Sequence, residues 1–114
     1  MAVIQIPDIN GQPNQVCFQS PATPVDGSGT ANGQSQMILA AVPTGTVRSG
    51  WIVQNNSTQN YSMFVNDLGS PADTSPTSVV LLPGQFWPPP GYPVTQGAVY
   101  IMGTSGDNYM VRSW

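Results

Sequence analysis

The side chains that could do acid–base or metal chemistry in this sequence are five aspartates, because it contains no His, Lys or Glu. Hydrolysis by paired carboxylates requires two such groups at a fixed separation, and calcium takes carboxylate and carbonyl oxygens. Most of the aspartates stand in turn-like contexts, as in Asp26-Gly27, Asp67-Leu68-Gly69 and Gly106-Asp107-Asn108. Neither the Asp67 loop nor the Asp107 loop has the dense acidic spacing of a dedicated calcium site. We therefore expect no catalytic residue, no metal, no cofactor and no enzymatic activity.

Cys17 is the single cysteine, so no internal disulfide can form. It lies in the strand-like run Gln15 to Phe18, where a free cysteine usually behaves as a small hydrophobe. A catalytic thiol normally needs a base such as His, and the sequence has none. We expect Cys17 to be buried and unreactive.

The low charge of the chain limits the kinds of molecule that we expect it to bind. Charged residues make up 6% of the 114 positions, and the formal net charge is −3. Nucleic-acid binding relies on clustered Lys and Arg, whereas Arg48 and Arg112 are far apart in the sequence, so we expect no nucleic-acid partner. No apolar run approaches the ~18 residues of a membrane helix and no signal peptide is visible, so we expect no membrane. A surface of Ser, Thr, Asn and Gln can form contacts without burying ions, which suits permanent docking.

Short alternating runs separated by Gly and Pro predict an all-β chain with no significant helix. We expect a single domain, residues 1–114, folded as an antiparallel β-sandwich that resembles a jelly roll. The turn Leu82–Gln85 has Pro and Gly at the positions that a type II turn favours, and Gly103–Asn108 is typical of a hairpin loop. About eight strands are predicted: residues 3–6, 16–18, 37–42, 47–54, 61–66, 78–82, 98–103 and 109–114.

Residues 19–36 do not fit this strand pattern, because Val25 is almost the only apolar side chain among them. A structureless loop longer than ~15 residues is uncommon in a compact domain. We predict a long polar loop or arm at about residues 19–36, which is either mobile or ordered by lying on a neighbouring protein.

The segment Gln85–Pro93 is the richest local motif, with three prolines in a row flanked by aromatic residues. Three interpretations of this segment are open. Its aromatic rings could pack on the prolines and hold a rigid loop, its Pro-Pro-Gly-Tyr could be the ligand of a WW domain, or the segment could dock on another protein. Trp51 is expected in the core, and Trp114 is expected either to tuck into the sandwich, which we favour, or to anchor a partner. The predicted interface residues are Phe86, Trp87, Pro89, Tyr92 and Trp114.

Several runs resemble small virion proteins of tailed bacteriophages, including the cement or decoration proteins of icosahedral heads. These runs are Ile52–Ser57, Met63–Asn66, Leu81–Gly84 before the aromatic-proline loop, Gly97–Gly103 and Val111–Trp114. The resemblance covers about the last two-thirds of the chain. It implies a jelly-roll-like fold, a homo-oligomer (dimer or trimer) on the capsid exterior, and no enzymatic activity. The sequence departs from it at Arg112-Ser113-Trp114, where an acidic residue is expected before the Trp.

We therefore expect a capsid cement protein, assembled in the host cytoplasm, that binds the major capsid protein on the outside of the head and stabilises the shell. The alternative is a tail-fibre or carbohydrate-binding virion module that stacks Trp87, Tyr92 or Trp51 on sugar rings.

Overall fold

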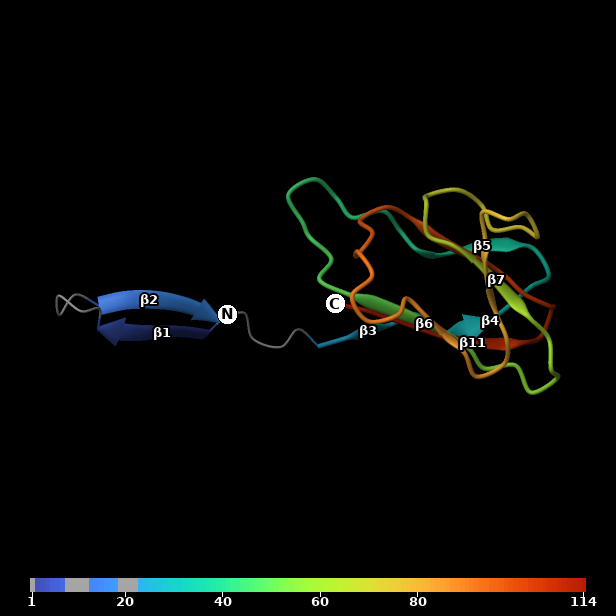
Figure 1. Ribbon diagram of the computed structural model, residues 1–114, viewed down its shortest axis with the longest axis horizontal. Coiled ribbons are helices and arrows are strands. Elements are labelled where there is room, and N and C mark those ends of the chain that lie inside the picture. The colour runs from blue at the N-terminus through green and yellow to red at the C-terminus, as the bar shows by residue number, and fades with distance from the viewer. Residues whose placement is uncertain (1, 8–12, 19–22) are drawn as a thin grey trace.

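The protein is described by a computed structural model that gives the backbone of residues 2–7, 13–18 and 23–114, and side chains from Thr23 onward. Nine strands form two antiparallel sheets, and the described residues contain no helix, as predicted (Figure 1). One sheet has the order β5 (Ser35–Leu39), β10 (Val99–Met102), β7 (Met63–Asn66), β8 (Val79–Leu81). In the other, β11 (Asn108–Ser113) pairs with β3 (Val25–Asp26) and β4 (Gly29–Thr30) on one side and with β6 (Trp51–Asn55) on the other, and β9 (Phe86–Trp87) follows β6.

The core lies between these two sheets and gives the molecule a sandwich-like form. Every second residue of β6 is buried, as expected for a strand with one face on a core. Val53 from that sheet and Val65, Val99 and Ile101 from the other are all fully buried and belong to one cluster. Burying each such side chain contributes about 1.5–3 kcal/mol. Trp51 joins this cluster at 3% exposure, as the sequence predicts.

The second half of the expected loop at residues 19–36 is structured, and this is the main difference from the prediction. β3 pairs with β11 through Asp26 and Arg112, and β4 pairs with β11 through Thr30 and Asn108. The Gly27 N–H between them donates to the Val111 carbonyl over 2.9 Å. These strands are held by main-chain hydrogen bonds rather than by apolar side chains, so the apolar pattern misses them. Residues 19–22 lie outside the described part of the chain.

The expected type II turn is confirmed. In the turn Leu82–Gln85, the Gln85 N–H donates to the Leu82 carbonyl over 2.9 Å, and Gly84 has a φ of +85°. Only glycine adopts that backbone conformation without strain. The hairpin expected at Gly103–Asn108 is wrong: a turn there joins β10 to β11, with Gly106 at a φ of +93°, but these two strands lie in different sheets and do not pair with each other. The first turn connects β8 to β9, and it therefore links an edge strand of one sheet to an edge strand of the other.

The remaining two strands, β1 (Ala2–Pro7) and β2 (Pro13–Phe18), form a separate antiparallel hairpin. Its register runs from Ala2 opposite Phe18 to Pro7 opposite Pro13. Figure 1 shows this hairpin beyond one end of the two larger sheets. Cys17 lies on β2 opposite Val3. Its side chain lies outside the described residues, so its burial stays a prediction.

Candidate functional site

Trp87 is the best-anchored residue of the aromatic-proline segment. It lies on β9 opposite Val53, is half-buried, and precedes a cis peptide bond to Pro88. Its indole Nε1–H donates to the Asp67 carboxylate over 3.0 Å. The Tyr92 ring meets the indole edge-on, with 4.8 Å between ring centroids and 63° between ring planes. Such a pair contributes about 0.5–1.5 kcal/mol beyond its buried area. Trp87 therefore fastens this segment to the fold.

Asp67 is the buried acidic residue that the aromatic-proline segment contacts. It follows β7 and is only 6% exposed. Burial raises the pKa of the Tyr92 phenol, and the negative charge of Asp67 and a hydrogen bond to it raise it further. The carboxylate thus holds two aromatic side chains that come from a different strand and loop. None of the sequence patterns linked Asp67 to this segment. The one available signal was general: a tryptophan that is buried usually needs a hydrogen-bond acceptor for its indole N–H.

The exposed part of the segment borders a groove between the edge strands β8 and β9. The groove encloses about 510 Å³ and is lined by Val80, Gln85, Phe86, Trp87 and Pro89, among others. Phe86 and Val80 are each 51% exposed, and Pro89 is also exposed. Of the five predicted interface residues, three therefore line one groove, and Tyr92 packs against one of them, Trp87.

Trp114 lines a different groove. Its N–H donates to the Gly50 carbonyl over 3.0 Å, and its own carbonyl accepts from the N–H groups of Ser49 and Gly50. Its indole lies directly over Gly50, where a Cβ atom would collide with the ring. The ring is nevertheless 43% exposed. Trp114 is thus tucked against the sandwich on one side and open to solvent on the other.

The outer face of the β5-β10-β7-β8 sheet is largely apolar, which the strand predictions did not anticipate. One row of register partners crosses it from Ser35 through Met102 and Phe64 to Val80. A second row runs from Met37 through Tyr100 to Asn66. Five of these seven side chains are apolar. Phe64, Tyr100 and Met102 are half-buried, and Met37 is 55% exposed. A sheet with one face in water normally carries polar residues on that face. We refer to these five residues as the apolar outer face.

The outer face of the other sheet has a mixed character, with charged, polar and apolar residues. One row of register partners is Asp26, Arg112 and Ile52, and a second contains Met110, Gln54 and Phe86. It carries both signs of charge and an amide, whereas the apolar outer face carries no charged residue. The outer faces of the two sheets therefore differ in charge.

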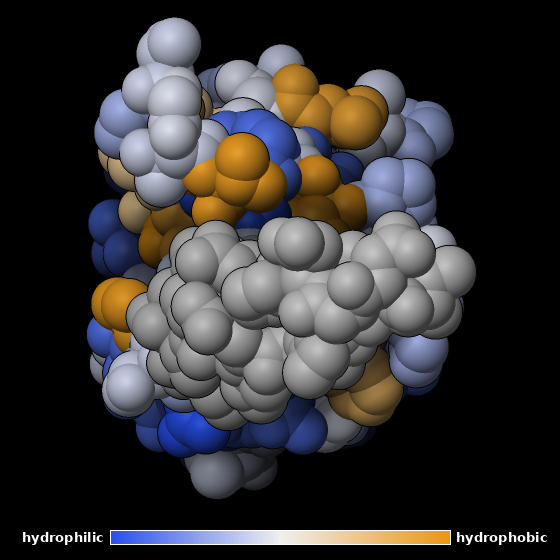
Figure 2. Space-filling model, turned by 90° about the vertical axis from the view of Figure 1, so that its left-hand side faces the viewer, coloured by the Kyte–Doolittle hydropathy of each residue, from blue (hydrophilic) through white to orange (hydrophobic). Residues whose placement is uncertain are grey.

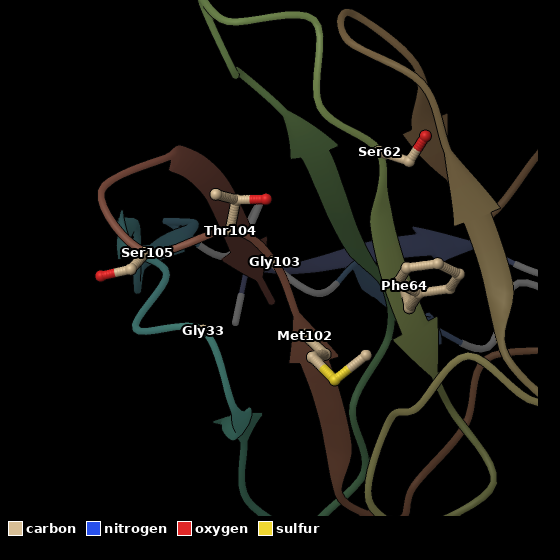
Figure 3. A pocket seen from close by; sticks show the side chains of 7 residues that line it. All are labelled: Gly33, Ser62, Phe64, Met102, Gly103, Thr104 and Ser105. Atoms are coloured by element: carbon tan, nitrogen blue, oxygen red, sulfur yellow. The ribbon is translucent and has the colours of Figure 1, made fainter.

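A small open pocket lies at one end of the apolar outer face (Figure 3). It encloses about 310 Å³, and Phe64 and Met102 from neighbouring strands line it together with the hydroxyl side chains Ser62, Thr104 and Ser105. A nucleophilic hydroxyl needs an adjacent base, and none of the described residues that line this pocket is an Asp, Glu, His or Lys. The pocket therefore offers hydrogen-bonding hydroxyls beside an apolar surface.

The part of the chain that the structure describes contains no group of three His, Cys, Asp or Glu residues that could hold a metal ion. Within that same part, no helix is long and apolar enough to cross a membrane. Comparison of the chain with protein-family models, with curated proteins and with solved structures gives no significant match.

Proposed function

We propose that this protein is a non-catalytic cement or decoration protein of a tailed-bacteriophage head, which docks on the major capsid protein and stabilises the shell from outside. The observation that carries the proposal is the apolar outer face, which covers four strands and holds no charged residue. Contiguous exposed apolar surface of this kind marks protein-interaction sites. The groove lined by Phe86 and Pro89 continues it, because Val80 belongs to both surfaces.

A jelly roll is the fold that we propose for the sandwich. When β3 and β4 are taken as one interrupted strand, the two larger sheets contain eight strands. The first then pairs with the last, the second with the seventh, the third with the sixth and the fourth with the fifth. This nested pairing supports the proposal, because a jelly roll is an eight-stranded double sheet made of two Greek keys that recurs in viral capsid domains.

The chemistry of the apolar outer face suits a permanent contact. Docking through it desolvates no ion, so the contact avoids the cost of burying a charge. It also depends little on salt, because screening acts on charged groups. A homo-oligomer, dimer or trimer, would present two or three such faces to neighbouring capsid subunits. Each further contact would then form at high effective concentration, which makes weak single contacts strong together.

The carbohydrate-binding alternative has less support. Stacking on a sugar requires aromatic rings that are exposed and share a plane. Trp51 is 3% exposed, and the rings of Trp87 and Tyr92 are inclined by 63°. Only Phe86 offers a largely exposed ring in this segment.

Two measurements test the proposal. The first is the copy number of the chain in purified virions by quantitative mass spectrometry, where hundreds of copies support a head protein and about a dozen or fewer contradict it. The second is co-sedimentation with heads that lack the protein. We expect Val80→Asp to abolish binding, because it places a carboxylate in the apolar contact. Leu68→Asp is the matched control, because Leu68 is an exposed aliphatic residue, 71% exposed, that lies outside this face and outside the groove between β8 and β9. Equal binding of both variants would contradict docking through the apolar outer face.

A further inference from the structure

The β1–β2 hairpin has no strand partner in the larger sheets. Among the described strands, β1 and β2 pair only with each other, and Figure 1 shows them beyond the end of the sandwich. An isolated two-stranded hairpin is marginally stable at best in water. The sequences of the two strands, AVIQIP and PNQVCF, contain no charged residue. A hairpin of this composition is stabilised when an apolar surface covers it.

An apolar groove is open at the end of the sandwich that faces the hairpin. It encloses about 340 Å³, and its lining includes Val25, Ala40, Val42, Val47 and Trp114. Val47 is 75% exposed, Val25 is 66% exposed and Trp114 is 43% exposed. Figure 2 looks onto this end and shows hydrophobic residues at several separate places among hydrophilic ones. We refer to this site as the end groove.

The end groove is chemically matched to an uncharged occupant. Among the described side chains that line it, Arg48 is the only charged one, and its guanidinium is already bonded to the carbonyls of Ala40, Thr95 and Gly97. An acidic or basic partner therefore finds no free counter-charge in it. The groove also lies close to the hairpin along the chain, because Val25 lines the groove and is the first strand residue after the hairpin. Figure 1 shows the hairpin extending away from this end of the sandwich.

We propose that the hairpin of one copy lies in the end groove of a second copy, and that two copies exchange hairpins in this way. Each chain then donates one hairpin and receives one, which gives a closed twofold dimer with two identical contacts. The second contact forms within the dimer and so at high effective concentration. This inference is independent of docking on a capsid, because it uses neither the apolar outer face nor the groove between β8 and β9.

The test is the molar mass of the full-length protein in solution, measured by sedimentation equilibrium across micromolar concentrations. The wild-type chain should be a dimer, and Val47→Asp should raise the dimer dissociation constant by about 100-fold or more, since it buries an unpaired carboxylate in the contact. Ile4→Asp, which changes the donated hairpin, should have the same effect. Val80→Asp is the matched control, since it adds the same charge at another exposed valine, and should leave the dimer intact.

The outcomes separate this proposal from its rivals. A chain that is monomeric at all concentrations overturns it, including the case in which the hairpin docks on its own sandwich. A dimer that resists Val47→Asp or Ile4→Asp overturns it as well, as does a dimer broken only by Val80→Asp. Circular dichroism of each variant confirms that the sandwich remains folded. Failure of head binding with an intact exchanged dimer contradicts only the capsid proposal.

Discussion

Replacement of Arg48 by Met should destabilise the fold more than the same replacement at Arg112. Arg48 is 8% exposed, and its guanidinium donates to the carbonyls of Ala40, Thr95 and Gly97 over 2.7, 2.9 and 3.1 Å. Burial lowers the pKa of this guanidinium from its usual value. The side chain thereby joins two loops that are about fifty residues apart in sequence. Methionine keeps much of the aliphatic stem and removes all three donors.

The magnitude follows from those three hydrogen bonds. A hydrogen bond to a charged group contributes about 1.5–3 kcal/mol, so the gross loss is roughly 5–9 kcal/mol. Removal of the cation also recovers its own desolvation cost, which is several kcal/mol. We therefore expect a net loss of about 3–5 kcal/mol, comparable to breaking a buried ion pair. That is a large part of the ~5–15 kcal/mol by which a domain is normally stable.

Urea unfolding monitored by the fluorescence of buried Trp51 measures this loss. With a slope of about 1.5 kcal/mol per molar urea, the midpoint of Arg48→Met should fall by roughly 2 M or more. Arg112→Met is the control, because Arg112 is exposed on β11 and should cost less than ~1 kcal/mol. The reasoning would be refuted by equal midpoints for the two variants, since the carbonyls would then be satisfied equally well without the guanidinium.

Three further predictions concern other buried contacts. Asn55→Leu should cost about 2–4 kcal/mol of unfolding free energy in the same urea assay, because Asn55 is fully buried and its amide donates to two main-chain carbonyls at 2.9 Å. Gly50→Ala should displace Trp114, because the new Cβ would collide with its indole, and a red shift of tryptophan emission should report this. Asp67→Asn should lower the pKa of Tyr92, followed by phenolate absorbance, since the Asp67 charge helps to raise it. The raised pKa means that the Tyr92 contribution to stability is present below pH ~10 and is lost as pH rises through the folded-state pKa. An unchanged Tyr92 titration would contradict that assignment.

The strands that pack on the core were predictable from the sequence, whereas the short edge strands were not. In β6 and β11, apolar residues recur at every second position because one face is buried. β3 and β4 leave no such pattern, since their pairing with β11 depends on backbone groups that every residue type has. A two-residue strand such as β9 is equally invisible, because period-2 alternation needs at least four residues to be read.

The candidate docking surface was predictable only in part. Phe86, Trp87 and Pro89 are close in sequence, and their shared groove with β8 follows from the turn between the two strands. The apolar outer face joins strands that are far apart in sequence, so it required the pairing of β10 with β5 and β7. A signal was nevertheless present in the run Val99–Met102, where apolar residues occupy both faces of one strand.

The burial of Arg48 also means that cleavage by trypsin can report the unfolding of this protein. Trypsin cleaves after Lys or Arg, and the sequence offers it only Arg48 and Arg112. The first is buried and bonded through its guanidinium, and the second lies in a strand paired on both sides. A protease needs a locally unfolded segment, so the folded protein presents almost no cleavable site. The rate of cleavage after Arg48 therefore measures how often the sandwich opens under native conditions, without denaturant or any label.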